Sequence, residues 1–412
     1  MNIFEDLQWR GLVYAMTDPA LEAQLNSKPM TFYLGADPTA DSLHVGHLLA
    51  YLVAKRLLIA GHKPILVIGG GTGLIGDPSF KSQERQLLTI ETSLENAEGI
   101  KRQVVHLLPN ALIVNNYDWL SSLNAIEFLR DIGKHFNVSY MMSKDSVKSR
   151  IENGISFTEF SYQIIQAWDF EYLFQKYGCD LQIGGQDQWG NITSGLELIR
   201  KVHGFEAKAY GFTFPLVTKA DGTKFGKTES GTIWLDKDKT SVYEFYQFWI
   251  NTADDDVVMR LKQFTFLDKS VIDELEIQVK TNPHLRLAQR VLAKEVTSLV
   301  HGEVLLQEAK QISEALFSGE IGSLTASQIK IGFADLIGQV LDQDCPLVDV
   351  LIQCDLAKSK RESRELIQSG SITINGKKVE GIDFLLTKDQ AIESKYSVIR
   401  KGKKKYSVVE HK

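Results

Sequence analysis

Two histidines three residues apart, His44 and His47, have the residue type and the spacing to do chemistry. They close the segment Asp37–His47, whose polar turn follows a short apolar run and precedes a helical pattern that we expect to begin at Ser42. Residues at i and i+3 share one face of a helix, and Gly46 leaves room for a ligand to approach the backbone. Because a helix N-terminus already favours anions, this turn predicts a site for a polyphosphate whose charge grows during a reaction.

A cationic, glycine-rich segment lies far downstream. It contains Lys224-Phe-Gly-Lys-Thr228, whose two lysines are compact cations on long stems. Each motif alone has an ordinary interpretation, the histidines as a metal pair or surface residues and the loop as a solvated turn. No Cys or third His near the histidines completes a set of metal ligands. Together, the two motifs predict a mobile cationic loop that closes over phosphates held at the histidine turn.

Three polar residues, Tyr162, Gln166 and Asp169, recur at helical spacing in an otherwise apolar and aromatic segment. They stand at i, i+4 and i+7 of a helix expected over 158–177, and therefore on one face. One interpretation is a stripe that faces solvent. The other is a stripe that faces a small polar ligand, since buried hydrogen-bonding groups cost free energy unless they find partners. Periodicity alone leaves both interpretations open.

The composition is typical of a globular protein of two or three domains. The chain has 412 residues, of which 43% are hydrophobic and 24% are charged. Its net charge of −6 is unevenly distributed, because residues 345–412 hold 14 Lys and Arg against 9 Asp and Glu, a balance of +5 that leaves −11 for the remainder. A basic segment on an acidic body predicts that the C-terminal module contacts phosphate backbones. A merely solvated basic surface is the alternative.

Cysteine usage and hydropathy predict a cytoplasmic protein with no membrane span. Cys179, Cys345 and Cys354 fit no zinc spacing and cannot all pair with one another, which is typical of a reducing compartment. The first residues lack the charged-then-apolar pattern of a signal sequence. No apolar run reaches the length that a transmembrane helix needs.

Residues 1–235 alternate short apolar runs with helical patterns, which predicts an α/β domain with a Rossmann-like parallel sheet. The expected strands are 31–35, 64–69, 111–115, 180–183 and 213–217, and the expected helices include 85–107, 125–136 and 158–177. Ligands of such sheets bind beyond the carboxyl ends of the strands. Segments 37–47 and 69–77 directly follow expected strands, so we expect both at the site.

The remainder of the chain divides into three segments. Strand signals vanish over 236–318, which predicts an α-helical domain. Glycines between short apolar groups mark 319–345 as a linker with some structure. Residues 346–412 are compact and basic, and we expect them to form a small α+β domain.

The two signature segments resemble those of the class I aminoacyl-tRNA synthetases. The HIGH signature corresponds to His44-Val-Gly-His47, and the KMSKS signature corresponds to Lys224-Phe-Gly-Lys-Thr228. Further segments narrow the resemblance to the bacterial tyrosyl-tRNA synthetases, namely Tyr33–Ser42, Gly73–Ser79, Ile155–Tyr162 and Leu181–Asn191. The resemblance extends over essentially the whole chain. It implies a catalytic domain, an α-helical domain of the anticodon region, a small RNA-binding domain and a homodimeric assembly.

The resemblance implies the activity of a tyrosine–tRNA ligase. In that reaction the carboxylate of L-tyrosine attacks the α-phosphate of ATP, pyrophosphate leaves, and the tyrosyl-adenylate then acylates the 3′-terminal ribose of tRNA(Tyr). Because the substrate supplies the nucleophile, catalysis should come from positioning and from stabilising charge that develops in the transition state. Mg²⁺ is expected to accompany ATP through its phosphates, with no metal site of the protein's own and no tightly bound cofactor.

The resemblance also assigns the tyrosine pocket. Asp169 and Tyr33 are expected to contact the phenolic hydroxyl group of tyrosine. The remaining pocket residues are Asp77, Tyr162 and Gln166 at the ammonium group and Gln188 near the reacting carboxylate. Phenylalanine would leave Asp169 and Tyr33 desolvated and unpaired, and tyrosyl-tRNA synthetase is itself the reference example of such discrimination, roughly 10⁵ without editing.

The nucleotide site is assigned in the same way. The expected phosphate donors are Thr39, His44 and His47. The residues expected around the leaving pyrophosphate are Lys224, Lys227, Thr228, Lys81 and Arg85. The expected nucleotide contacts are Asp37, Gly46, Gly185, Asp187 and Lys227. Asp37 could also lie near the ammonium group, Asp187 can accept from the ribose 2′-hydroxyl, and exposed charges at a helix start are an equal alternative for Lys81 and Arg85.

The chain departs from the better-known pattern at two positions near the nucleotide. Leu34 stands where a cysteine near the ribose is common, and Ala50 stands where a hydroxyl residue can occur. Both departures bear on the affinity for ATP. The loop reads Lys-Phe-Gly-Lys-Thr in place of Lys-Met-Ser-Lys-Ser, but both lysines and the terminal hydroxyl group remain.

The basic C-terminal segment resembles a small RNA-binding domain shared with a ribosomal small-subunit protein. Four of its cations gather at the start of an expected helix that ends at Gly370, namely Lys358, Lys360, Arg361 and Arg364. Such a patch suits an RNA backbone rather than base readout. Structured RNA is therefore the expected partner of this segment.

The sequence leaves three competing functions to be weighed. A tryptophanyl-tRNA synthetase shares the catalytic fold, but Tyr33 with Asp169 favours a phenol over an indole. An RNA-binding scaffold without catalysis is disfavoured because the signature histidines and lysines are intact. A general nucleotidyltransferase also uses an H-x-G-H turn, but it has no need of a basic RNA-binding tail.

Overall fold

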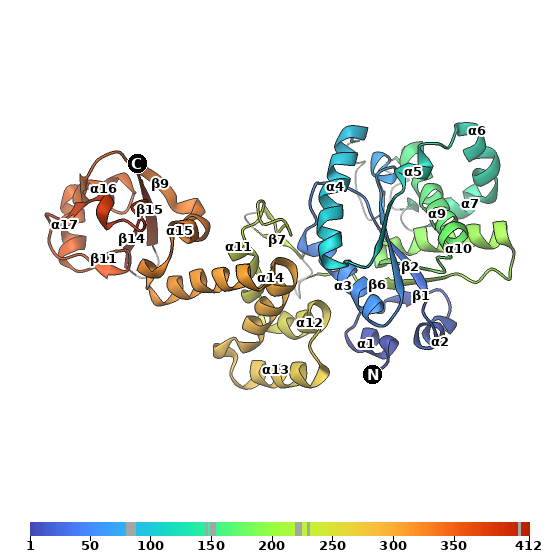
Figure 1. Ribbon diagram of the computed structural model, residues 1–412, viewed down its shortest axis with the longest axis horizontal. Coiled ribbons are helices and arrows are strands. Elements are labelled where there is room, and N and C mark those ends of the chain that lie inside the picture. Colours follow the sequence, from blue (N-terminus) through green and yellow to red (C-terminus); the bar gives the residue numbers. More distant parts are fainter. Residues whose placement is uncertain (80–87, 145–146, 149–153, 219–224, 229–230, 403–404) are drawn as a thin grey trace. The chain divides into compact units, whose positions relative to one another are not determined.

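The structure is a computed structural model that describes the chain except residues 80–87, 145–146, 149–153, 219–224, 229–230 and 403–404 (Figure 1). The chain forms two compact units. Unit 1 comprises Met1–Lys239 and Thr252–Leu292, and unit 2 comprises Thr240–Asn251 and Ala293–Lys412. The division of the chain into functional domains is a separate question and stays a prediction.

Unit 1 is built on a six-stranded sheet in the order β1-β6-β5-β2-β3-β4. The strands are β1 (Ala15–Met16), β2 (Thr31–Ala36), β3 (Lys63–Ile68), β4 (Leu112–Asn115), β5 (Leu181–Gly185) and β6 (Tyr210–Phe214). Strands β2 to β6 are parallel to their neighbours, and only β1 pairs in the antiparallel direction. The expected parallel sheet is confirmed. The strand expected over 213–217 is observed as Tyr210–Phe214. It ends before Pro215, because proline lacks the N–H that the hydrogen-bonded ladder needs.

Helices pack on both sides of this sheet and extend unit 1 beyond it. They are α1 (Ile3–Trp9), α2 (Ala20–Ser27), α3 (Val45–Ile59), α4 (Ile90–Leu107), α5 (Tyr117–Leu120), α6 (Ala125–Glu127), α7 (Val138–Met142), α9 (Phe157–Tyr177), α10 (Trp189–His203), α12 (Asp254–Phe264) and α13 (Lys269–Thr281). Figure 1 shows α4 on one side of the strands and α9 and α10 on the other. Apolar side chains of β2 and β3, including Tyr33 and Val67, pack against Phe170 and Leu173 of α9. This packing fixes α9 beside the carboxyl ends of the strands.

Two predicted helices differ from the observed ones. The helix expected over 125–136 is divided into α6, a π-helical turn (Phe128–Ile132) and a 3₁₀ turn (Gly133–His135), where glycine weakens the helix. The helix expected over 85–107 begins at Ile90, because the hydroxyl group of Thr89 accepts from the Thr92 N–H and caps it. Residues 85–87 lie outside the described part of the chain.

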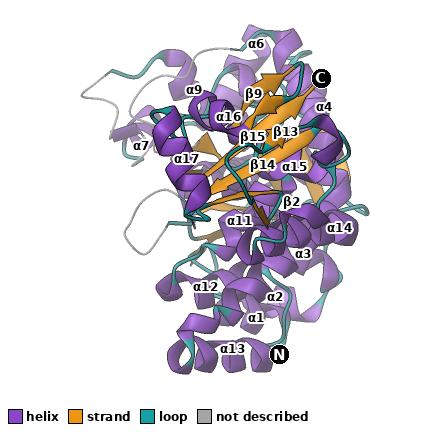
Figure 2. Cartoon of the chain, turned by 90° about the vertical axis from the view of Figure 1, so that its left-hand side faces the viewer, coloured by secondary structure: helices purple, strands orange, loops and turns teal. Residues whose placement is uncertain are grey.

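Unit 2 contains a five-stranded sheet in the order β12-β11-β14-β15-β9 and a two-stranded sheet of β10 and β13 (Figure 2). The strands are β9 (Ile337–Leu341), β10 (Cys345–Pro346), β11 (Ile372–Ile374), β12 (Lys377–Lys378), β13 (Leu385–Leu386), β14 (Tyr396–Lys401) and β15 (Lys405–His411). The helices are α11 (Val242–Ile250), the part of α14 (Leu287–Ser318) from Ala293, α15 (Ala326–Gly332), α16 (Leu347–Gln353) and α17 (Lys360–Gln368). Helix α14 is interrupted at Gly302, whose φ is 83°.

The segment 319–345, expected to be a linker, is part of the fold of unit 2. It contains α15 and β9, and β9 pairs in parallel with β15. Ile329 and Phe333 lie in a buried apolar cluster with Val398 and Val408 of the sheet. Residues 319–345 therefore pack as part of unit 2, because buried apolar residues outweigh the glycines that suggested a linker.

The helices of the described residues are too short or too polar to cross a bilayer. None of them combines the length and the apolar character that a membrane span demands.

Candidate active site at the carboxyl ends of the strands

A cavity of about 260 Å³ opens beyond the carboxyl ends of β2, β3 and β5. Its lining includes the expected site residues Tyr33, Asp37, Thr39, Gly46, His47, Asp77, Tyr162, Gln166, Asp169, Gly185, Asp187 and Gln188. Leu34 and Ala50, the two departures from the family pattern, line it as well. Segments that are far apart in the sequence therefore meet at one pocket, at the edge of the sheet where a parallel fold binds its ligands.

The histidine turn forms the start of α3, but its cap differs from the expected one. His44, and not Ser42, is the N-cap residue, and its Nδ1 accepts from the Gly46 N–H at 3.0 Å. The hydroxyl group of Ser42 is engaged elsewhere, because it donates to the Leu43 carbonyl and accepts from Gln103. A side chain that is already held by two partners is not available to cap a helix.

The two imidazole rings of this turn are held in a fixed arrangement. They stack with their centroids 3.7 Å apart, and the Nδ1 atom of His47 accepts from the His44 N–H at 3.4 Å. Because each Nδ1 accepts a backbone N–H, the hydrogen-bond pattern assigns the proton of each neutral ring to Nε2. A Cβ atom at Gly46 would stand 2.8 Å from the His44 ring, so the glycine is required by the ring itself.

A second cavity, of about 410 Å³, adjoins the first at the histidine turn. It shares Asp37, Thr39 and His47 with the first cavity, and it adds His44 and Trp234. The Trp234 ring contacts the His44 ring edge-on, with the two ring centroids 6.0 Å apart. The two cavities together give room for a small ligand beside a larger one, with the histidines between them.

Asp169 lies at the closed end of the pocket and is almost completely buried. Its two carboxylate oxygens accept from Trp119 Nε1 at 2.8 Å and from Asn116 Nδ2 at 2.9 Å. Burial raises its pKa to about 7 against these two hydrogen bonds, which lower it. Burial and the nearby Asp169 charge also raise the pKa of the Tyr33 phenol. Near neutral pH, the protonation state of Asp169 therefore depends on the group that contacts its carboxyl oxygens.

Asp37 is the centre of a second hydrogen-bonded group. Its carboxylate accepts from Tyr162 Oη at 2.9 Å and from Thr72 Oγ1 at 2.6 Å. Asn116 donates to Thr72 Oγ1 at 2.9 Å as well as to Asp169. Through Asn116 and Thr72, the carboxylates of Asp37 and Asp169 are held in one network.

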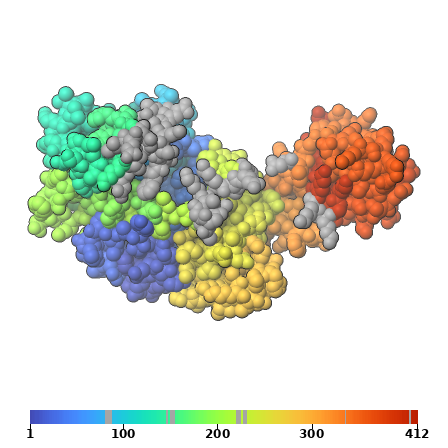
Figure 3. Space-filling model, turned by 180° about the vertical axis from the view of Figure 1, so that it is seen from behind, coloured from blue at the N-terminus to red at the C-terminus, as the bar shows by residue number. Residues whose placement is uncertain are grey.

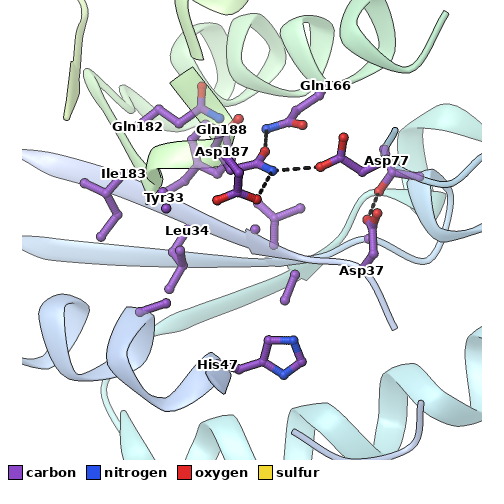
Figure 4. A pocket seen from close by; sticks show the side chains of 18 of the residues that line it. Tyr33, Leu34, Asp37, His47, Asp77, Gln166, Gln182, Ile183, Asp187 and Gln188 are labelled. Carbon is purple, nitrogen blue, oxygen red and sulfur yellow. Dashed lines mark hydrogen bonds between the residues drawn. The ribbon is translucent and has the colours of Figure 1, made fainter. Parts of the chain in front are cut away.

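Asp77 belongs to a third hydrogen-bonded group of the pocket (Figure 4). Its carboxylate accepts from Gln188 Nε2 at 2.7 Å and from the Ser79 N–H at 2.9 Å. Gln188 also donates to Asp187 at 3.1 Å and accepts from Gln166 Nε2 at 3.1 Å. Figure 4 shows His47 on the opposite side of the pocket from Gln188.

Three buried polar atoms in this pocket lack a protein partner. Within the described part of the chain, Tyr33 Oη, Gln166 Oε1 and Gln182 Oε1 make no hydrogen bond of ordinary length. Leaving such groups unpaired costs about 1–3 kcal/mol each. A cavity lined by unpaired donors and acceptors indicates that a polar ligand completes them.

Several functional residues were missed by the sequence analysis. Asn116 and Trp119 hold Asp169, Thr72 holds Asp37, and Gln182 lines the pocket from β5. Asn116 directly follows β4, so the rule that ligands bind beyond strand ends could have indicated it. Thr72 lies in the segment 69–77, which follows β3, so the same rule could have indicated it as well. For Trp119 and Gln182 the sequence holds no comparable signal.

The expected loop residues are only partly within the described chain. Lys81, Arg85 and Lys224 lie outside it. Lys227 and Thr228 form β7 (Lys227–Thr228), which pairs with β8 (Gly231–Thr232). The backbone after them is fastened to the histidine turn, because the Val45 N–H donates to the Ile233 carbonyl at 3.0 Å. The two signature segments therefore meet.

The four expected RNA contacts lie in unit 2, at and beside α17. All four side chains, Lys358, Lys360, Arg361 and Arg364, are exposed. Two of them have acidic neighbours, since Lys360 pairs with Asp349 at 2.7 Å and Arg361 pairs with Glu365 at 2.9 Å. The patch is thus a solvent-accessible cationic surface.

Among the described residues, no group of three or more His, Cys, Asp or Glu side chains is placed to hold a metal ion.

Known proteins share both the fold and these segments. Residues 25–318 match the family model of the class I tRNA synthetases (W and Y), and residues 328–409 match that of the tyrosine–tRNA ligase SYY-like C-terminal domain. The crystal structure of a C-terminally truncated mitochondrial tyrosyl-tRNA synthetase from Aspergillus nidulans is 32% identical, with a TM-score of 0.70. The match covers 77% of this chain and 94% of that chain.

Curated relatives match over the full length. The tyrosine–tRNA ligase of Geobacillus stearothermophilus is 55% identical over 419 residues, which is 100% of both chains. Tyrosine–tRNA ligase 1 of Bacillus subtilis (strain 168) is 54% identical over 420 residues, again 100% of both. The chain therefore belongs to the class I tRNA synthetase family, as one of its tyrosine–tRNA ligases.

Proposed function

We propose that this protein activates L-tyrosine with ATP to tyrosyl-adenylate and pyrophosphate, and then transfers tyrosine to the 3′-terminal ribose of tRNA(Tyr). The observation that carries the proposal is the closed end of the pocket. There, the carboxyl group of Asp169 and the unpartnered hydroxyl group of Tyr33 face a cavity of amino-acid size. A phenol can donate to Asp169 and accept from Tyr33, which a phenyl ring cannot do.

The ammonium group of tyrosine is proposed to bind at Asp77, Tyr162 and Gln166. Asp77, Tyr162 and Gln166 all line the cavity, and the Oε1 atom of Gln166 lacks a partner there. A carboxylate, a phenol oxygen and an amide oxygen together form a charge-assisted site for a cation. Asp37, which accepts from Tyr162, supports the same site from behind.

The phosphates of ATP are proposed to lie at the histidine turn, with the ribose near Asp187. Thr39 and His47 line both cavities, and a ring with its proton on Nε2 donates a hydrogen bond to a phosphate oxygen. Such preorganised donors stabilise charge that develops on the α-phosphate as the tyrosine carboxylate attacks. Mg²⁺ is proposed to enter with ATP, whose phosphates supply its ligands and whose charge it offsets.

The affinity for tyrosine should depend on pH through Asp169. Because the pKa of Asp169 is about 7 in the free protein and a phenol donates to its ionised form, raising the pH from 6 to 8 should strengthen tyrosine binding about tenfold. Equilibrium dialysis with labelled tyrosine at several pH values measures this. The KM for ATP at saturating tyrosine serves as the control, because ATP does not contact Asp169. An affinity that is flat or that falls over this range would contradict the assignment.

The same ionisation affects stability. The folded-state pKa of Asp169 lies above the ordinary value of 3.8, so the folded state binds the extra proton between about pH 4 and pH 7. The contribution of this group to the free energy of unfolding therefore falls as the pH rises through that window and is constant above it.

The cationic patch of unit 2 should bind tRNA without affecting activation. Replacing Lys358 and Arg364 by alanine should weaken tRNA binding about tenfold and make it less sensitive to salt, because fewer counterions are released from the RNA backbone. Filter binding at several salt concentrations measures both. The charge-matched control is Lys28→Ala with Lys63→Ala, at exposed positions near the amino ends of β2 and β3. Equal weakening by both pairs would assign the effect to net charge alone.

The protein is proposed to act as a homodimer in a reducing cytoplasm. Unit 1 exposes large apolar side chains between α6 and α9, among them Ile126, Val138 and Phe157, the last at 72% exposure. The segment that carries α6 and α7 is the teal lobe of Figure 3. Exposed apolar side chains gathered in one segment suit a protein interface. Size-exclusion chromatography with light scattering distinguishes a monomer from a dimer. The three free cysteines suit a reducing cytoplasm.

The test of the activity is ATP–pyrophosphate exchange with tyrosine, phenylalanine and tryptophan in parallel. Exchange with tyrosine alone is expected. Exchange with tryptophan would favour the other specificity that this family includes. An absence of exchange with all three amino acids would overturn the enzymatic proposal and leave an RNA-binding role.

A further inference from the structure

Arg260, on α12, contacts both ends of the lysine-bearing loop. This residue is 3% exposed, and it lies outside the pocket and outside both signature segments. One guanidinium nitrogen, Nη2, donates to the carbonyl of Thr218, just before the undescribed residues 219–224. The guanidinium lies over the ring of Phe225, just after them, with Cζ 4.8 Å from the ring centroid.

The guanidinium is itself held in place by its own helix. Gln263 accepts from Arg260 Nη1 at 2.8 Å, and Asp256 lies one turn earlier at 3.4 Å from Nη2. Phe264, at the end of the same helix, stacks on Phe225 at 5.5 Å. The Phe225 side chain is therefore enclosed by a cation and an aromatic ring from α12.

Phe225 is continuous with the backbone that contacts the histidine turn. A Cβ atom at Gly226 would stand 2.6 Å from a methyl group of Val45, so the two chains are in close contact there. The Ile233 N–H donates to the Gly226 carbonyl at 3.1 Å, and the Ile233 carbonyl accepts from the Val45 N–H. Fixing Phe225 thus fixes the strand Lys227–Thr228 relative to His44.

We infer that Arg260 is a positioning residue for adenylate formation: it fastens Thr218 and Phe225 to α12 and so sets where the backbone of the strand Lys227–Thr228 lies relative to the histidine turn. The inference rests on the proposed function and on the expected role of Lys227 at the leaving pyrophosphate. Arg260 touches neither ligand, and it acts through Phe225. Lysine cannot replace it fully, because a lysine lacks the flat fork that both stacks and donates.

The expected signature is a loss of rate without a loss of tyrosine affinity. In Arg260→Gln, single-turnover formation of tyrosyl-adenylate at saturating tyrosine and ATP should slow by about 10-fold to 100-fold, as a small misplacement near a reacting phosphate does. The KM for pyrophosphate in the reverse reaction should rise. The Kd for tyrosine should stay within about twofold of wild type, because the pocket is untouched. Arg260→Lys should recover only part of the rate.

Arg10→Gln is the matched control. Arg10 is equally buried, and it also grips the end of α12, by donating to the carbonyls of Lys262, Thr265 and Leu267. These hydrogen bonds hold the carboxyl end of α12. The contacts with Thr218 and Phe225 are made by Arg260. The loss of Arg10 should therefore lower the stability of the fold while adenylate formation keeps its rate.

The outcomes separate the inference from the proposed function. A wild-type rate in Arg260→Gln, or an equal loss of rate in Arg10→Gln, would overturn the inference. If Arg260→Gln fails to bind tyrosine because it does not fold, Phe264→Leu takes its place, since it removes the stacking on Phe225 while an apolar side chain stays in the core, and it should show the same slowed step. A wild-type protein without tyrosine-dependent exchange would instead overturn the proposed function.

Discussion

Replacement of Asp169 by asparagine is expected to lower kcat/KM for tyrosine by about 10³-fold to 10⁴-fold. The carboxylate accepts from both Asn116 and Trp119, and it is the proposed acceptor of the tyrosine hydroxyl group. An asparagine side chain has one acceptor oxygen, so its NH₂ group would face a donor that is already in place. The substrate would then lose a charge-assisted hydrogen bond, and a buried donor would lose its partner.

Steady-state pyrophosphate exchange with tyrosine and phenylalanine measures this effect. The rate with phenylalanine should change far less than the rate with tyrosine, because phenylalanine never had a hydrogen bond to lose. Glu171→Gln is the matched control, since it removes a buried carboxylate two residues further along α9. Glu171 is paired with His203 at 2.8 Å, and it does not line the cavity. A loss below tenfold in Asp169→Asn would show that the phenol binds elsewhere.

Much of the site could be predicted because it follows from two local rules. Parallel strands place whatever follows them at one edge of the sheet, which brought 37–47 and 69–77 together. The helical period placed Tyr162, Gln166 and Asp169 on one face of α9, and the cavity lies against that face. Neither rule needs knowledge of distant contacts.

What could not be predicted depends on contacts between distant residues. Trp119 reaches Asp169 from a helix of four residues that has no periodic signal of its own. Ser42 has the residue type of a cap, but Gln103 on α4 engages its hydroxyl group, and the cap passes to His44. A sequence pattern gives the candidates for a hydrogen bond, whereas packing decides which of them receives it.

The packing of 319–345 could not be predicted for a related reason. The glycines of 319–345 favour a linker locally, but β9 gains its stability from pairing with β15, which lies at the far end of the chain. A short strand that depends on a distant partner carries little local signal.

Replacement of His44 by asparagine is expected to slow adenylate formation by about 10²-fold to 10³-fold while the fold keeps its stability. The Oδ1 atom of asparagine can accept from the Gly46 N–H as Nδ1 does, and asparagine is among the best N-cap residues. Its side chain, however, has no atom at the position of Nε2. The variant therefore removes the proposed phosphate donor and leaves the helix cap in place.

His44→Ala removes both functions and so separates them. It should slow adenylate formation to the same extent as His44→Asn and, in addition, lower the free energy of unfolding by about 1 kcal/mol, which is the usual cost of a lost N-cap. Single-turnover kinetics and urea denaturation of the two variants give the two quantities. If His44→Asn kept the wild-type rate, the ring would serve only as a cap. The phosphate site would then depend on the helix N-terminus, on Thr39 and on His47, because these are the expected phosphate donors that remain at the two cavities.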